Sequence, residues 1–250
     1  MVVRLKDKVS IITGAAKGIG KETALIFGEE GSNVIVTDID LDGASETASL
    51  MHDKGYNATP MQLDLSKLDN IKEFVKRVLS EFSRIDILIN NAGLFSNVPI
   101  LEMTENEWDK VMNVNLKGTF FLSKEILPIM IQKKYGKIVN ISSLAAKRGG
   151  VTSGINYASS KAGVISVTKC LAKFSAPFGI NVNAVVPSFC DTPMFRGLPP
   201  EKQDSAIKSI PLGRIARPDE LGKAILFLAS DDASYITGEI LDVNGGVLMD

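Results

Sequence analysis

Residues 9–20 read VSIITGAAKGIG and place a short β-branched run directly before a glycine-rich turn. The run predicts a buried strand that ends at Gly14, and a helical pattern follows over residues 19–30. Glycines at such a turn let the backbone approach the pyrophosphate of a dinucleotide, and the positive N-terminus of the helix favours its charge. The spacing is Gly-x-x-x-Gly-x-Gly rather than the usual Gly-x-Gly-x-x-Gly. A strand-to-helix turn that binds no ligand is the alternative interpretation.

The same alternation of strand and helix continues to the C-terminus. Short apolar runs predict further strands at residues 33–37, 58–63, 85–89, 136–142, 181–186 and 239–243. Helical periodicity predicts helices at residues 41–54, 66–82, 104–134, 155–176 and 218–230. This pattern is typical of an α/β fold with a doubly wound parallel sheet covered by helices on both faces. We therefore expect one Rossmann-type domain over residues 1–250, with ligands bound at the carboxyl ends of the strands.

Composition excludes several classes of function. The net charge of −1 gives no electrostatic reason to expect binding to nucleic acid or to an anionic membrane. The apolar runs are too short to span a bilayer, and charges near the N-terminus argue against a signal peptide, so we expect a cytoplasmic protein. Cys170 and Cys190 lack a CxxC spacing and are interpreted as reduced thiols. His52 is the single histidine, which excludes a histidine-based metal site and a Ser-His-Asp triad.

Acid–base chemistry must therefore come from other side chains, and Tyr157 with Lys161 is the leading candidate. The two residues are four apart in NYASSKAG, so a helix would place them on one face. A nearby cation favours the phenolate, and we expect Lys161 to lower the pKa of Tyr157. The alternative is an exposed helical turn in which the tyrosine packs and the lysine is solvated.

Acidic and amide residues follow several predicted strands. Asp38 ends the second strand, where a carboxylate can accept bonds from the adenosine ribose and would repel a 2′-phosphate. This favours NAD over NADP, although Lys17 could pair with such a phosphate. Asp64, after the third strand, could bond the adenine amino group, and residues 90–93 (NNAG) allow close backbone passage. The alternatives are helix caps for both aspartates and a plain turn for residues 90–93.

Three further polar residues are candidates for the reaction itself. Ser143 ends the fifth strand, where its hydroxyl could hold a carbonyl oxygen, and Ser142 is the competing candidate. Either serine could instead be a cap. Asn115 falls inside the long predicted helix, where its propensity is unfavourable. It is interpreted either as an amide that perturbs the helix and orders a water, or as a tolerated surface residue.

Taken in order, TGAAKGIG, NNAG, Asn115, Ser143 and YASSK resemble the short-chain dehydrogenases/reductases of about 250 residues, and the similarity extends to TGEILDVNGG near the C-terminus. The resemblance implies a seven-stranded doubly wound sheet, a homotetramer and a catalytic tetrad of Asn115, Ser143, Tyr157 and Lys161. It also implies a nicotinamide cofactor, bound by Gly14, Lys17, Gly18, Ile19, Gly20, Asp38, Ile39, Asp64, Leu65, Asn91, Ala92, Gly93, Tyr157, Lys161, Pro187, Ser188 and Thr192.

Two departures from the family pattern affect the expected cofactor and substrate. Pro187-Ser188 stands where the family usually has Pro-Gly, so the serine could crowd the nicotinamide or bond to substrate. The 3-oxoacyl-carrier-protein reductases, which this chain resembles most, usually have an arginine where Phe178 stands here, although Lys133 and Lys134 keep positive charge nearby. Those reductases also usually prefer NADPH, which conflicts with the interpretation of Asp38.

Residues 188–210 contain three prolines and predict a mobile lid over the substrate. A moderately apolar small molecule is expected to contact Leu144, Val151, Phe189, Met194 and Phe195; the alternative is that these side chains pack the lid or an interface. We therefore expect an NAD(H)-dependent oxidoreductase that interconverts a secondary alcohol and a ketone. The first alternative is an NADPH-dependent 3-oxoacyl-thioester (acyl-carrier-protein) reductase. A dinucleotide-binding sensor without chemistry is the remote alternative, because Tyr157 and Lys161 are both present.

Overall fold

Seven parallel strands form one sheet in the order β3-β2-β1-β4-β5-β6-β7, which confirms the predicted fold class. The protein is represented by a computed structural model that describes residues 3–150 and 153–249. The strands are β1 (Val9–Thr13), β2 (Asn33–Asp38), β3 (Ala58–Gln62), β4 (Ile87–Asn90), β5 (Gly136–Ile141), β6 (Ile180–Pro187) and β7 (Ile240–Val243). Their register aligns the carboxyl ends along one edge, as in the pairing of Thr13 with Thr37. The strand order reverses between β1 and β4, so a crevice opens at the carboxyl ends of these two strands.

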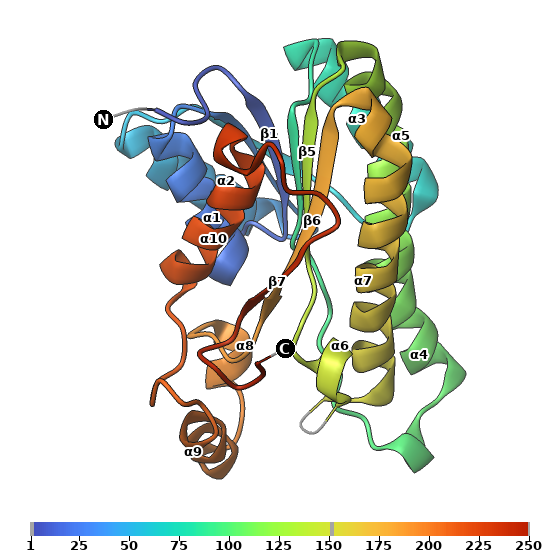
Figure 1. Cartoon of the computed structure of the whole chain (residues 1–250), viewed down its shortest axis with the longest axis vertical. Helices are drawn as coiled ribbons and strands as arrows, with labels where there is room; N and C mark the ends of the chain where they lie inside the picture. Colours follow the sequence, from blue (N-terminus) through green and yellow to red (C-terminus); the bar gives the residue numbers. More distant parts are fainter. Residues whose placement is uncertain (1–2, 151–152, 250) are drawn as a thin grey trace.

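Helices cover both faces of this sheet (Figure 1). One face carries α1 (Gly18–Glu29), α2 (Leu41–Asp53) and α10 (Pro218–Ala229). The other carries α3 (Leu68–Phe82), α5 (Thr119–Lys133) and α7 (Ile155–Ser175). Shorter elements are η1 (Ile100–Glu102), α6 (Ala145–Arg148), η3 (Ala176–Phe178) and η4 (Asp231–Ala233). Within the described residues, no helix combines the length and apolarity that crossing a membrane requires.

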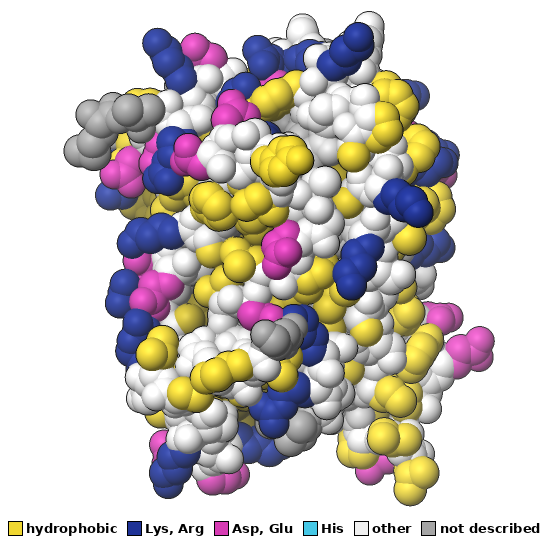
Figure 2. Space-filling view, viewed as in Figure 1, with side chains coloured by type: hydrophobic (Ala, Val, Ile, Leu, Met, Phe, Trp, Pro, Cys, Tyr) yellow, Lys and Arg dark blue, Asp and Glu magenta, His cyan; other side chains and the backbone are white. Residues whose placement is uncertain are grey.

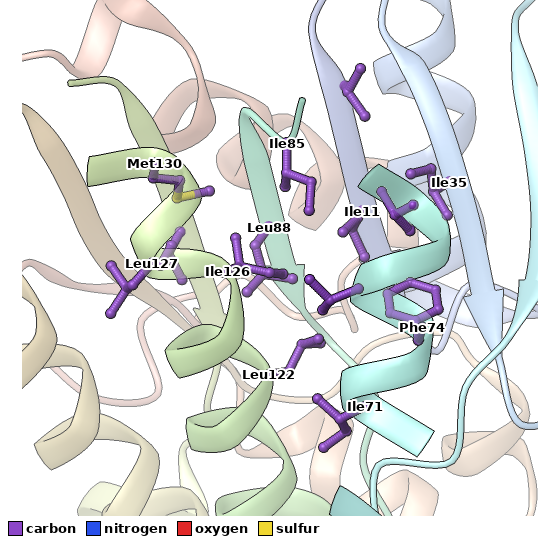
Figure 3. Close-up of a cluster of buried hydrophobic side chains, with 14 of the residues drawn as sticks. Ile11, Ile35, Ile71, Phe74, Ile85, Leu88, Leu122, Ile126, Leu127 and Met130 are labelled. Carbon is purple, nitrogen blue, oxygen red and sulfur yellow. The ribbon is translucent and has the colours of Figure 1, made fainter. Parts of the chain in front are cut away.

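The hydrophobic core lies in two layers, one on each side of the sheet. Figure 3 shows part of one layer, in which Phe74 of α3 and Leu122 of α5 lie over Ile11 and Leu88 of the central strands. The opposite layer includes Phe27 of α1, which is fully buried. Because helices cover both faces, every residue of β1, β4 and β5 is buried, including polar residues such as Lys137 and Asn140.

The glycine turn between β1 and α1 is built on positive backbone angles and close packing. Gly14 and Gly18 have φ values of 67° and 60°, which side-chain-bearing residues rarely adopt. Gly20 has a different role, since a Cβ on it would lie 2.2 Å from the Gly14 carbonyl oxygen and 2.6 Å from Nδ2 of Asn91. It allows α1 to pack against the turn itself.

The long helix predicted over residues 104–134 is interrupted. The structure contains α4 (Glu105–Met112), a six-residue π-helix η2 (Asn113–Gly118) and then α5. The interruption has a local cause, because the side-chain amide of Asn115 is bonded to both backbone groups of Leu94 rather than left in solvent. A Cβ on Gly118 would lie 2.7 Å from the Leu65 carbonyl oxygen, so the segment also packs tightly against the loop after β3. The helical path therefore covers the predicted residues but includes a π-helical turn at Asn115. Of the two interpretations of Asn115, the tolerated surface residue is wrong, because the side chain is fully buried.

The predicted lid, residues 188–210, contains two helices rather than an open loop. These are α8 (Pro193–Arg196) and α9 (Pro200–Lys208). Ala216, which follows the lid, is bonded to the start of the lid, since its N–H donates to the Phe189 carbonyl at 3.0 Å and its carbonyl accepts from Asp191 N–H at 2.9 Å. These bonds place the lid beside the carboxyl edge of the sheet.

Replacing Gly20 with alanine should destabilise the protein, because the new methyl group would overlap the Gly14 carbonyl and the Asn91 amide. Overpacking of this kind costs roughly 1–3 kcal/mol, and urea unfolding followed by circular dichroism measures it. Gly55→Asn is the matched control, since Gly55 has φ of 79° but nothing within 4 Å, and asparagine tolerates that conformation. Equal unfolding midpoints for the two variants would contradict this explanation.

Candidate active site

A cleft of about 1390 Å³ lies at the carboxyl edge of the sheet and gathers most of the predicted site residues. Its walls include Gly14, Lys17, Gly18, Ile19, Asp38, Ile39, Asp64, Leu65, Asn91, Ala92, Gly93, Ser143, Leu144, Tyr157, Lys161, Pro187, Ser188, Phe189, Thr192, Met194 and Phe195. Two predicted residues do not line it: Gly20 packs behind the glycine turn, and Asn115 lies behind Gly93. Val151 lies outside the described residues.

Tyr157 and Lys161 share one face near the start of α7 and both line the cleft. The Lys161 ammonium lies 6.0 Å from the centroid of the Tyr157 ring and donates a 2.7 Å hydrogen bond to the Ile141 carbonyl. Lys161 is 4% exposed, and this burial lowers its pKa to about 8. Burial raises the pKa of Tyr157, and the hydrogen bond with Ser143 opposes this only in part. The expected lowering of the Tyr157 pKa was therefore wrong for the ligand-free protein, because desolvation outweighs the stabilisation of the phenolate.

The structure distinguishes the two candidate serines. Ser142 is 2% exposed, and its hydroxyl donates to the Lys161 carbonyl at 2.8 Å, which fixes the catalytic helix to the end of β5. Ser143 lines the cleft together with Tyr157, and its hydroxyl lies close enough to the phenol to lower the pKa of Tyr157 in part. Two hydroxyl groups, Ser143 Oγ and Tyr157 Oη, thus meet at one point of the cleft wall and can hold one carbonyl oxygen between them.

Asn115 does not line the cleft but lies behind its wall. Its Oδ1 accepts from Leu94 N–H at 2.7 Å, and its Nδ2 donates to the Leu94 carbonyl at 3.0 Å and to Ser160 Oγ at 3.1 Å. A Cβ on Gly93 would lie 3.3 Å from Lys161 Nζ and 3.4 Å from Asn115 Oδ1. A side chain at position 93 would therefore crowd the lysine and the asparagine, which glycine avoids.

The two aspartates of the cleft have different local roles. The Asp38 carboxylate accepts from the N–H groups of Ala16 and Asp40, each at 3.1 Å, while Asp40 is the residue that caps α2. Asp38 is thus not a helix cap. Asp64 instead holds its own turn, because its carboxylate accepts from the backbone and hydroxyl of Ser66 and pairs with Lys67 at 3.2 Å. Burial alone would raise the pKa of Asp64, but these partners outweigh it and the pKa lies below its ordinary value.

Two other predicted cofactor contacts are occupied by bonds within the protein. The Asn91 amide donates to the carbonyls of Thr13 and Gly14 at 2.9 and 3.1 Å, so it shapes the glycine turn. The Ser188 hydroxyl donates to the Asn244 carbonyl at 3.0 Å. The bond holds the serine side chain against the residue that follows β7. It therefore explains why a serine can replace the family's glycine at this position.

The wall near β1 and β2 fits a dinucleotide. Among the described residues, no side chain caps the N-terminus of α1, and its first turn contains no acidic residue. These free N–H groups can donate hydrogen bonds to an anionic pyrophosphate. Thr37 Oγ1 is buried beside Asp38 without a hydrogen-bond partner in the described part of the chain. Thr192 lies over the turn, since a Cβ on Gly18 would be 3.3 Å from its methyl group.

The far end of the cleft is apolar and aromatic. The Phe95 ring meets the Tyr157 ring edge-to-face at 5.3 Å, and the Phe189 and Phe195 rings lie 5.8 Å apart at the lid. The charged residues of the outer rim are Lys110, Arg148, Glu201 and Lys202, of which the sequence offered only Arg148, as a possible carboxylate clamp without a position. No strand-end or motif signal marks them, because they reach the cleft from helices that only the tertiary structure brings together.

Comparison with known proteins identifies the family. A family model described as enoyl-(acyl carrier protein) reductase matches residues 14–248. The chain is 43% identical to 3-oxoacyl-(acyl-carrier-protein) reductase FabG of Thermotoga maritima, covering 99% of this chain and 100% of that protein. It is 38% identical to (2S)-((R)-hydroxy(phenyl)methyl)succinyl-CoA dehydrogenase subunit BbsD of Thauera aromatica, covering 97% of each. The crystal structure of gox2181 superimposes with a TM-score of 0.95 at 33% identity, covering 98% of this chain and 97% of that one.

The chain belongs to the short-chain dehydrogenase/reductase family. It is an oxidoreductase that acts on CH–OH groups with a nicotinamide dinucleotide.

Lys161→Met should stabilise the ligand-free protein near neutral pH. The folded-state pKa of about 8 lies below the ordinary 10.5, a difference of roughly 3 kcal/mol at about 1.36 kcal/mol per unit. This cost of burying the ammonium is fully present below pH 8 and disappears as the pH rises through 10.5. Allowing for the lost bond to Ile141, we expect a gain of about 1–3 kcal/mol at pH 7.

Urea unfolding at pH 7 and pH 10 measures this gain, which should be smaller at pH 10. Lys169→Met, at an exposed position on the same helix, is the control and should change little at either pH. A Lys161→Met protein less stable than the wild type at pH 7 would contradict the burial argument.

Proposed function

We propose that this protein reduces the ketone of a 3-oxoacyl thioester with NADH, or oxidises the corresponding 3-hydroxyacyl thioester with NAD. The observation that carries the proposal is the pair of hydroxyls from Ser143 and Tyr157, at the inner end of an apolar cleft and backed by buried Lys161. The names of the relatives support the thioester, since one is a carrier-protein thioester reductase and another a CoA thioester dehydrogenase. A thioester therefore replaces the predicted simple alcohol or ketone as the favoured substrate.

In this mechanism the bound nicotinamide supplies or accepts the hydride. The hydroxyls of Ser143 and Tyr157 donate hydrogen bonds to the ketone oxygen, where negative charge develops during reduction. Burial raises the pKa of Tyr157, which keeps the phenol protonated at neutral pH, and this is the form that can give its proton to that oxygen. The Lys161 ammonium, held on the Ile141 carbonyl, limits the cost of the phenolate left behind.

The preference for NADH is supported by Asp38. Its carboxylate lies on the cleft wall at the end of β2 and is held there by two backbone N–H groups. A fixed carboxylate at this place repels the 2′-phosphate of NADPH. Lys17 also lines the cleft and would attract that phosphate, but it is not bonded to Asp38 and does not remove the repulsion.

Tyr157→Phe should lower turnover by about 10²–10⁴-fold, which is the contribution of a positioned acid–base group. The substitution removes only the hydroxyl and keeps the ring that packs on Phe95. NADH binding, measured by fluorescence titration, should be unchanged. Turnover at the wild-type rate would overturn the assignment of Tyr157 as the acid.

Titration with both cofactors tests Asp38. We expect NADPH to bind at least about tenfold more weakly than NADH, which corresponds to about 1.4 kcal/mol. Asp38→Asn removes the charge while keeping a similar side chain, so it should lower the ratio of the NADPH dissociation constant to the NADH dissociation constant. Asp42→Asn, on the exposed first turn of α2, is the control and should leave the ratio unchanged. Tighter binding of NADPH by the wild type would contradict the argument.

We also propose a cytoplasmic homotetramer, as the family resemblance implies. Exposed aromatic side chains on the outer faces of α5 and α7, Phe120 and Phe174, support an interface there. Light scattering measures the assembly directly.

A further inference from the structure

The following inference rests on the proposed function. A 3-oxoacyl thioester needs space for a long carrier arm, which a simple ketone does not have. Its reacting carbon lies between two arms, the acyl tail on one side and the thioester with its carrier on the other. With the ketone oxygen fixed between Ser143 and Tyr157, the two arms must leave the site in different directions. The carrier arm of such thioesters is phosphopantetheine, a long and thin chain of amides that ends in a phosphate. The site therefore needs an apolar exit and a second exit that ends in positive charge.

The apolar exit lies under the lid. Phe189, Phe195, Met194 and Leu198 line this part of the cleft, and Phe195 is 6% exposed. These side chains suit an acyl tail and offer nothing to an amide or a phosphate.

The second exit lies between the end of α6 and α9. Arg148 from α6 and Lys202 from α9 both line the cleft and are exposed at its rim. Neither cation forms an ion pair with any residue among 3–150 and 153–249. Glu201 is an acidic neighbour on this part of the rim. Figure 2 shows dark blue side chains gathered in the region between α9 and α6.

A second hollow of about 620 Å³ continues from this rim. It shares Ala145, Gly149, Ser153 and Lys202 with the catalytic cleft. Most of its other wall residues are small, including Ala146, Ala158 and Ala162, which leaves room for a narrow chain. Ser153 lines both hollows at their junction, and its Oγ is buried without a hydrogen-bond partner in the described part of the protein.

We propose that Arg148 and Lys202 bind the phosphate of the phosphopantetheine arm, with the arm passing Ser153 on its way from the catalytic serine and tyrosine. This phosphate is common to coenzyme A and to acylated carrier proteins. The two rim cations would then select a carrier-bound 3-oxoacyl thioester over a short thioester without phosphate.

The test compares acetoacetyl thioesters that differ only in the carrier: N-acetylcysteamine, which has no phosphate, 4′-phosphopantetheine, coenzyme A and an acyl carrier protein. In Arg148→Gln/Lys202→Gln, KM for the coenzyme A and phosphopantetheine thioesters should rise about tenfold at low ionic strength, with kcat unchanged. KM for the N-acetylcysteamine thioester should not change. Raising the salt concentration should weaken the wild-type advantage of the phosphorylated substrates.

Two further variants sharpen the test. Lys208→Gln removes a cation from the same helix α9 at an exposed position outside the cleft, and it should change no KM. Glu201→Gln removes the repelling charge and should lower KM for the phosphorylated thioesters only. A shift in the opposite direction would contradict the proposed site.

The outcomes separate this proposal from the proposed function. If no thioester is reduced by the wild type, the proposed function fails. If all are reduced but the double variant raises KM for the thioester without phosphate equally, the function stands and the phosphate site is overturned. An effect with coenzyme A that is absent with phosphopantetheine also overturns the site, because the shared phosphate is then not what the cations bind. If the site is supported, the wild-type KM values for the coenzyme A thioester and the carrier-protein thioester are compared. The thioester with the lower KM then identifies the natural carrier.

Discussion

The arrangement of the whole site depends on the contact between the ends of β1 and β4. Thr13 Oγ1 accepts from the N–H groups of Asn91 and Ala92, each at 3.0 Å, while the Asn91 amide donates to the carbonyls of Thr13 and Gly14. These bonds join the glycine turn to the loop after β4 at the place where the strand order reverses. The crevice that receives a dinucleotide exists because the two loops separate in opposite directions from this contact.

From this contact the loop after β4 leads to Gly93, which lies against both Lys161 and Asn115 and so connects the glycine turn to the catalytic helix. The π-helical turn at Asn115 holds Leu94, and Ser142 holds the backbone of α7 at Lys161. A buried ammonium is costly, and its pKa of about 8 records that cost. The protein therefore retains a lysine that destabilises the ligand-free fold, which is common where a side chain is kept for chemistry rather than for packing.

The substrate end of the cleft is formed instead by helices that are distant from each other in the sequence, those of the lid and α6. The start of the lid is bonded to Ala216, and α6 follows directly after Ser143. Apolar side chains face the cleft from the lid, while Arg148 and Lys202 stand at its outer rim. This division of an apolar wall and a cationic rim suits a substrate with one hydrophobic and one anionic arm.

By itself, the sequence determined the alternating α/β fold, the glycine turn, the strand ends that form the cleft and the pairing of Tyr157 with Lys161. These features depend on local periodicity and on short spacings along the chain. Only the tertiary structure decided that Ser142 is bonded to the Lys161 carbonyl, that Ser188 bonds to the Asn244 carbonyl, and that burial raises the pKa of Tyr157. Each of these outcomes depends on partners distant in sequence and on the loss of water around a side chain, which no local pattern of residues encodes.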